Sequence, residues 1–229
     1  MEHPFTWYSW LHVTGIPEQT FHTLIVMATL LVLAFFARRR LTEGRDRAVP
    51  EPGLGLANIF GFLVELVIGL SDGIIGKKGR RYASLFASFF IFILTANLFG
   101  LVPGFSPPTS NYNVTLSLGL ISFVAYNYFG VREHGARYIK QFMGPVLLLA
   151  PFFLVLEAVS HLVRPVSLSL RLFGNIFGDH LVVEIFTHLT RVGVPVLFYA
   201  LGALVSFIQA FVFTLLSVIY VAMAISHEH

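Results

Sequence analysis

The segment that decides the fold is EAVSHLVRPVSLSLRLFGNIFGDHLVVEIFTHLTR, residues 157–191. Its centre, residues 168–186, is apolar enough to lie in a lipid bilayer, yet it contains Arg171, Asp179 and Glu184. A charged side chain in the middle of a bilayer costs from about 3 to more than 10 kcal/mol. Such charges persist where they face a protein interior or a water-filled cavity, and they usually mark the pathway of an ion or a substrate. We therefore expect this helix to carry the function and the remaining chain to house it.

The composition predicts a membrane protein. Of the 229 residues, 56% are hydrophobic and 12% are charged, whereas an average soluble protein has about 25% charged residues. The chain has no cysteine, which excludes disulfides and thiolate metal sites. Phosphate-binding glycine-rich loops and hydrolase signatures are also absent from the sequence. We therefore expect no bound nucleotide, cofactor or metal, and no enzymatic activity in this chain alone.

The apolar runs predict an all-α, polytopic protein with a single membrane domain, residues 1–229. We expect about five transmembrane helices and one helix on the membrane surface. The expected parts are an outer N-terminus at 1–20, a first span at 21–37, a cytoplasmic surface helix at 54–76, a helical hairpin at 82–131 and a long channel-forming hairpin at 144–225. The surface helix is only moderately apolar, so a transmembrane alternative for it stays open.

The basic residues predict the orientation. Of the 15 lysines and arginines, five lie at 38–47, four at 77–81 and three at 132–140. Each group follows or precedes an apolar run, which fits the excess of positive charge in cytoplasmic loops better than it fits nucleic-acid binding. We therefore expect the N-terminus outside and the C-terminus in the cytoplasm.

The last two helices, about 144–190 and 194–225, are expected to tilt because both exceed the roughly 20 residues that span a bilayer. A helix break is expected at Pro165. At about 100° per residue, Arg171 shares one face with a set of small or amide side chains, which would allow another helix to approach closely. The set consists of Ser167, Gly174, Asn175 and Gly178. The opposite face carries His180, Glu184 and His188, which we expect to line a titratable path towards the outer surface.

Simpler interpretations of these side chains exist. Arg171 could extend to a membrane interface, and His180 could be a hydrogen-bonded core residue. Gln209 could bond a neighbouring helix, and Arg164 could mark the cytoplasmic interface. At the level of the whole protein, the alternatives are an ion-coupled secondary transporter and a structural membrane scaffold. A transporter would usually show inverted repeats and broken helices in both halves, which the sequence lacks.

Four motifs carry a resemblance to a known family. They are RPVSLSLRLFGNIFGDH at 164–180, SFIQAFVFTLLSVIYVAMA at 206–224, NLFGLVPG at 97–104 and NVTLSLGL at 113–120. In their order along the chain they resemble subunit a of the F-type ATP synthase, and the resemblance runs from about residue 80 onwards. The resemblance implies a stator in a bacterial inner membrane that works against a rotating ring of c subunits, with peripheral-stalk b subunits and lipid as further partners and no nucleic acid. Two aqueous half-channels would carry the ion, whose identity as proton or sodium this chain does not decide.

The resemblance also implies roles for single residues. The family's essential arginine matches Arg171, its nearby asparagine Asn175, its last-helix glutamine Gln209 and its upstream acid Glu157. Guanidinium is effectively never deprotonated, unlike a lysine in a low-dielectric site. It would stabilise the ionised ring carboxylate and block a direct leak between the half-channels.

One position departs from the family's pattern. The family pairs a titratable residue at the position of His180 with a second one on the last helix, where this chain has Gly202. The outer path must then combine His180 with another group, for which Glu184 is the first candidate and Asp179 the second. We also expect Gln209 to neighbour Arg171.

Overall fold

The computed structural model describes residues 7–10, 15–43, 55–102, 104–135, 138, 150–189 and 193–226, and their regular structure is entirely helical, which confirms the all-α class. The α-helices are α1 (Trp7–Trp10), α2 (Glu18–Glu43), α3 (Leu56–Ile75), α4 (Ala83–Phe99), α5 (Tyr112–His134), α7 (Ala150–Leu189) and α8 (Val194–Ile225). Two short 3₁₀ helices, η1 (Lys77–Arg81) and η2 (Pro108–Ser110), lie before α4 and α5.

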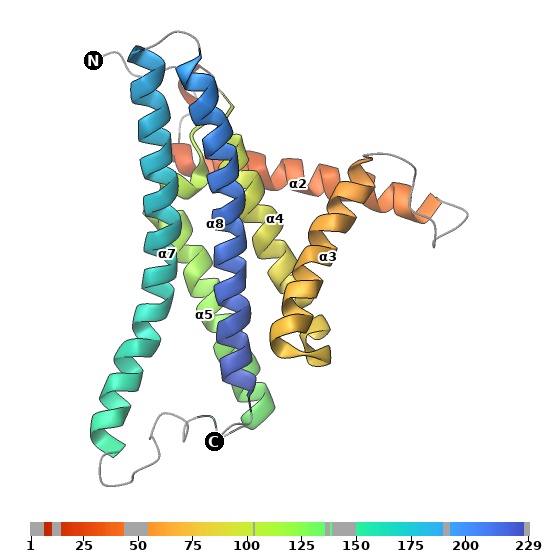
Figure 1. Ribbon diagram of the computed structural model, residues 1–229, viewed down its shortest axis with the longest axis vertical. Helices are drawn as coiled ribbons and strands as arrows, with labels where there is room; N and C mark the ends of the chain where they lie inside the picture. Colours follow the sequence, from red (N-terminus) through yellow and green to blue (C-terminus); the bar gives the residue numbers. More distant parts are fainter. Residues whose placement is uncertain are drawn as a thin grey trace.

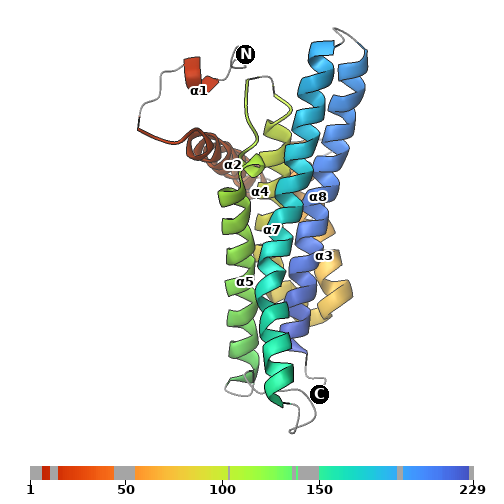
Figure 2. The same cartoon turned by 90° about the vertical axis from the view of Figure 1, so that its left-hand side faces the viewer.

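Helix α8 lies at the centre of the bundle. It packs against α3, α4, α5 and α7, and it runs antiparallel to α7 as the second arm of a long hairpin (Figures 1 and 2). Its inward face contributes fully buried residues such as Phe213 and Val218, and Phe213 meets Phe89 of α4 edge to face. Burial of apolar area is the main source of packing energy within such a core. The position of α8 makes it the surface against which α7 is held.

Helix α2 runs across the bundle rather than along it. It lies sideways in Figure 1 and is seen almost end-on in Figure 2, while α5, α7 and α8 run lengthwise in both views. It packs against α3 and α4, and most of its apolar side chains remain exposed, including Leu31 and Phe35. An apolar surface of this kind suits contact with lipid or with other membrane helices.

The arms of the hairpin are longer than a bilayer is thick. Helix α7 has 40 residues and α8 has 32, so at about 1.5 Å per residue they extend roughly 60 and 48 Å, against a hydrocarbon core of about 30 Å. They therefore fit a membrane only when strongly tilted. The predicted break at Pro165 is wrong, since α7 continues through it. The ribbon bends in its lower half instead (Figure 1), as a proline inside a helix usually causes.

Two sets of contacts bring together the segments that were predicted to share a side of the membrane. At one end, the backbone N–H of Trp7 donates to the carbonyl oxygen of Gly104 at 3.1 Å, so the N-terminal segment meets the turn between α4 and α5. At the other end, Lys78 Nζ and Glu133 Oε1 form an ion pair at 2.8 Å, which joins the basic segment η1 to the end of α5. The absolute orientation stays a prediction.

Four of the described helices are long and apolar enough to cross a membrane. These candidate spans are residues 18–39, 58–75, 112–134 and 196–225, and the shorter apolar helix is 83–99. Helix α3 is among them, although its residues were expected on the membrane surface. Both placements of α3 stay predictions, because length and composition alone do not locate a helix relative to the bilayer. The linker expected at 41–52 is described only for residues 41–43, which belong to α2, and the hairpin residues 144–149 lie outside the described residues.

At Gly119, α5 approaches α7 closely. A Cβ atom at this position would lie 2.7 Å from the carbonyl oxygen of Pro165 and in steric conflict with Oγ of Ser169. We expect Gly119→Ala to separate the two helices and to cost about 1–3 kcal/mol through overpacking. The measurements are the amount of this chain in the membrane and the thermal unfolding temperature of the detergent-solubilised complex.

Gly69→Ala in α3 is the matched control, since a Cβ there meets no atom within 4 Å and alanine has the higher helix propensity. Equal stability of the two variants would show that α5 and α7 do not require this close approach.

Candidate functional site

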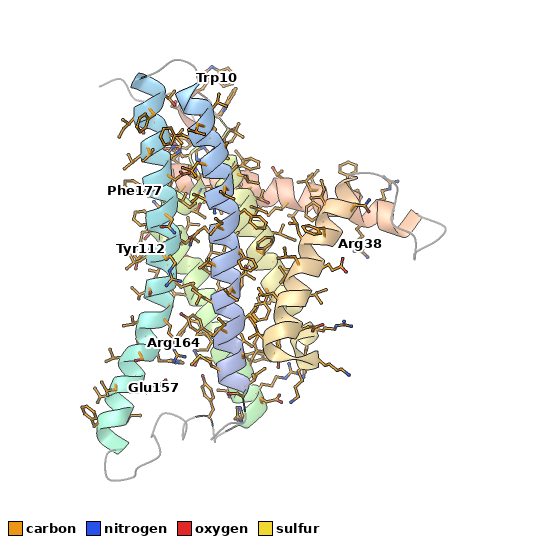
Figure 3. All side chains as sticks on the ribbon, in the orientation of Figure 1. Trp10, Arg38, Tyr112, Glu157, Arg164 and Phe177 are labelled. Atoms are coloured by element: carbon orange, nitrogen blue, oxygen red, sulfur yellow. The ribbon has the colours of Figure 1, made fainter. Side chains whose placement is uncertain are left out.

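The exposed face of α7 carries the predicted arginine. Arg171 and Gly174 are exposed, and a Cβ atom added at Gly174 or at Gly178 would meet no atom within 4 Å. The exposed, apolar Phe177 lies on the side of α7 away from α8 (Figure 3). Within the described part of the chain, the Arg171 guanidinium makes no ion pair or hydrogen bond. The structure thus presents a permanent positive charge beside an open, glycine-lined surface.

The two predicted amide residues contact one another. Asn175 Nδ2 donates a hydrogen bond to Gln209 Oε1 at 2.6 Å, which links α7 to α8 one turn from Arg171. Gln209 is only 3% exposed, and its Nε2 has no hydrogen-bond partner among the described atoms. Four residues along a helix correspond to about 6 Å, so Gln209 lies near the depth of Arg171. A direct contact between Gln209 and Arg171 stays a prediction.

Towards the C-terminal end of α7 from Arg171, Asp179 and His180 line the same small cavity. Its volume is about 10 Å³, close to the smallest that can hold one water molecule. The other lining residues come from α4, α7, α8 and the turn between α4 and α5: Asn97, Gly100, Leu101, Pro107, Ile176, Val183 and Ser206. A carboxylate and an imidazole on one polar cavity are able to exchange a proton through water.

Gly202 provides the space that the Asp179 carboxylate uses. A Cβ atom at Gly202 would lie 2.7 Å from Asp179 Oδ2 and 3.0 Å from Leu101 Cδ2. Glu184 is not among the residues that line the cavity. The structure thus brings the second candidate, Asp179, and not Glu184, to the cavity that His180 lines. Because Gly202 on α8 has no side chain, the Asp179 carboxylate of α7 fits beside it.

Asn97 and Thr109 extend this polar region and were not assigned a role from the sequence. Thr109 Oγ1 donates to Asn97 Oδ1 at 2.6 Å, and Asn97 Nδ2 donates to the carbonyl oxygen of Ser206 at 3.5 Å. Thr109 is fully buried and Asn97 is 3% exposed. Buried polar groups are usually hydrogen-bonded, as both of these side chains are. The motif at 97–104 contains Asn97, but its partner across the bundle becomes visible only in the fold.

Towards the N-terminal end of α7 from Arg171, Glu157 forms an ion pair with Arg164. Arg164 Nη2 lies 3.4 Å from Glu157 Oε1, and its guanidinium carbon lies 5.6 Å from the centre of the Tyr220 ring on α8. Figure 3 shows both charged residues in the lower half of α7. Arg164 was interpreted as a possible interface marker, and the structure gives it two specific partners. Ser167, predicted to contact the ring, is half-buried.

A second buried polar cluster joins α5 to the N-terminal half of α7, and its residues were also not identified from the sequence. His161 Nε2 lies 2.8 Å from Asn127 Oδ1, and both ring nitrogens lie 3.3 Å from the hydroxyl oxygen of Tyr126. His161 is 9% exposed and Tyr126 is 1% exposed. His161 lies within residues 157–191, the segment expected to carry the function. Its hydrogen-bond partners on α5 become visible only in the fold.

The described residues contain no group of three or more potential metal ligands. Of the outer stripe predicted on α7, Glu184 is half-buried. Nothing is described for the side chain of His188.

Comparison with known proteins agrees with the resemblance noted above. The model of the family described as ATP synthase A chain matches residues 20–222. ATP synthase subunit a of Bdellovibrio bacteriovorus is 45% identical over 221 residues, which cover 95% of this chain and 96% of that protein. ATP synthase subunit a 1 of Syntrophotalea carbinolica is 42% identical, and ATP synthase subunit a 3 of Pelobacter propionicus is 40% identical. Both alignments cover all of each chain. The chain therefore belongs to the ATP synthase A chain family, as a non-catalytic, multi-pass subunit of the membrane sector.

Proposed function

We propose that this chain is the ion-conducting stator of the membrane sector, with Arg171 facing a carboxylate on a rotating ring of c subunits. One observation carries the proposal: a guanidinium with no described counter-charge lies on an exposed, glycine-lined face of an otherwise apolar helix. A buried or lipid-facing charge is stable only with compensation. The compensation here would come from the partner, and Gly174 and Gly178 would let its helix approach closely.

The arginine would act as an electrostatic gate. A fixed positive charge favours the ionised form of a neighbouring carboxylate, so a ring carboxyl group would release its proton as it comes close. The arginine itself does not lose its proton, which would prevent protons from passing between the two half-channels along α7. The bond between Asn175 and Gln209 would hold the backbone of α7 at a fixed distance from α8 near the arginine.

The outer half-channel would pass through the cavity of Asp179 and His180. The support for this path is the shared cavity, the close fit of the Asp179 carboxylate to Gly202, and the buried Asn97 that lines the same space. Protons would enter from the outer surface and reach the ring carboxylate through this cavity. Glu157, which pairs with Arg164, would belong to the inner half-channel. The two half-channels would thus meet α7 on opposite sides of Arg171.

The assembly and orientation complete the proposal. The N-terminus would lie outside, the C-terminus in the cytoplasm, and the membrane would be a bacterial inner membrane. The exposed apolar surface of α2 would meet lipid and the membrane helices of the peripheral-stalk b subunits. The secondary-transporter and scaffold alternatives are favoured by no feature of the described residues.

Arg171→Lys tests the requirement for a cation that does not titrate. We expect Arg171→Lys and Arg171→Ala to abolish ATP-driven proton pumping while the complex still assembles, because lysine can lose its proton in a low-dielectric site. The measurements are acidification of proteoliposomes and the subunit content of the purified complex. Pumping by Arg171→Lys at the wild-type rate would contradict the proposed role of the arginine.

Asp179→Asn and Glu184→Gln test the path of the outer half-channel. We expect Asp179→Asn and His180→Ala each to slow proton uptake from the outside by roughly tenfold or more, since a positioned proton-transfer group contributes about 10²–10⁴ in rate where transfer limits. The double variant should lose less than the sum of the two, because both act in one path. Glu184→Gln is the matched control and should remain near wild type.

The measurement is the proton flux of reconstituted complexes between about pH 5 and 9 on the outer side, which brackets the histidine pKa of about 6.5. The reverse pattern, with slow flux in Glu184→Gln and normal flux in Asp179→Asn, would move the path to the other face of α7.

A further inference from the structure

All ionisable side chains of α7 between its inner end and Arg171 lie on one face of the helix. With Arg171 at zero and about 100° per residue, Arg164 falls at about 20°, Glu157 at about 40° and His161 at about 80°. Asn175, which contacts Gln209, falls on the same side at about 40°. A polar stripe therefore leads from the inner end of α7 to the arginine, and His161 is its one imidazole.

His161 is held in a hydrogen-bonded cluster where α5 meets α7. The hydroxyl of Tyr126 lies 3.3 Å from each ring nitrogen, and Asn127 Oδ1 lies 2.8 Å from Nε2. The Tyr138 hydroxyl donates to the same Asn127 oxygen at 3.1 Å, and Asn127 Nδ2 donates to the carbonyl oxygen of Phe123 at 2.8 Å. Asn127 is thus fixed with its oxygen towards the imidazole, which orients the ring.

The charged and titratable groups around His161 come from three helices and residue 138. Helix α7 contributes Glu157 and Arg164, α5 contributes Tyr126, and Tyr138 follows α5. Tyr220 of α8 packs against Tyr126, with ring centres 5.9 Å apart. Of these groups only Glu157 is a carboxylate, and it lies one helical turn from His161 towards the inner end. A proton leaving the imidazole would therefore find its acceptor on the inner side.

We propose that His161 is a proton relay in the inner half-channel, between the ring site beside Arg171 and Glu157. This inference rests on the proposed function and adds to it a residue that carries the ion. His161 lies ten residues from Arg171, or about 15 Å along the helix, so water bridges that distance. The ring carboxyl group gives up its proton to this water, and a ring nitrogen of His161 accepts one. The imidazolium then returns a proton to Glu157 or to inner water, and neutral imidazole is restored.

A purely structural His161 would only tie α5 to α7 through its hydrogen bonds. His161→Gln separates the two roles, because glutamine keeps a donor and an acceptor but does not titrate. The complex is reconstituted into liposomes with its nucleotide-binding side facing the bath, so that the bath supplies the inner half-channel during ATP-driven pumping. The measurement is the proton uptake rate at bath pH 6 to 9, divided by the uncoupled ATP hydrolysis rate at each pH.

We expect His161→Gln to pump at least about threefold more slowly and to lose the change in rate with bath pH that titration of an imidazole would cause in wild type. Its dependence on the pH inside the liposomes should remain that of wild type. Asp179→Asn is the matched control, since it should change the dependence on the inside pH and leave the bath dependence intact. A bath-pH profile of His161→Gln that matches wild type would show that His161 is only a structural link.

Two further variants are measured, one in case His161→Gln does not assemble and one to separate the relay from the proposed function. If His161→Gln does not assemble, His161→Glu replaces the imidazole with another titrating group. Pumping with its pH response moved to lower pH would support the relay, and pumping without a pH response would contradict it. Arg171→Ala measured in the same way separates the two proposals. Normal pumping by Arg171→Ala would overturn the proposed function, whereas inactive Arg171→Ala with a wild-type profile in His161→Gln would overturn the relay alone.

Discussion

The charge of Arg171 requires an opposite charge that the described residues do not supply. Its guanidinium lies on the exposed side of α7, while Leu172 and Ile176 on the other side are buried against the bundle. Burial of a permanent charge in an apolar environment is costly unless a counter-charge is close. The glycines beside it leave room for a helix backbone rather than for side chains of the same chain. The fold thus presents a positive charge without a counter-charge among the described residues, and a partner's carboxylate would supply that counter-charge.

The remaining helices keep this site in place and separate its two sides. Helix α8 fills the centre of the bundle and holds α7 through the bond between Asn175 and Gln209. Asp179 lies eight residues, or about 12 Å, to one side of Arg171, and His161 about 15 Å to the other. Under the proposed function, the titratable groups on both sides, with a non-titrating cation between them, would form two paths that each end near Arg171. Ions would then cross the membrane only when a moving carboxylate carries them from one path to the other.

The sequence predicted the parts of this account that depend on local pattern. Apolar runs predicted the long helices, although α2 continues six residues beyond the expected end of the first span, and helical periodicity placed Arg171 with Gly174 and Gly178. Pattern alone failed where the answer depended on which helix packs against which. The cavity that Asp179 and His180 share could not be predicted, because a helical wheel does not show that Gly202 on α8 faces the aspartate. The partners of Asn97 and His161 lie on other helices, so their clusters depend on a packing register that no single segment encodes.

The central claim concerns which face of α7 meets the ring. The most direct test is an experimental density map of the assembled membrane sector that resolves side chains. The account predicts that the carboxylate-bearing ring helix passes the exposed face of α7, next to Arg171, Gly174 and Gly178, with the cavity of Asp179 turned away from it. A map in which the ring packs on another helix, or in which Arg171 faces only lipid or is paired within its own chain, would contradict it.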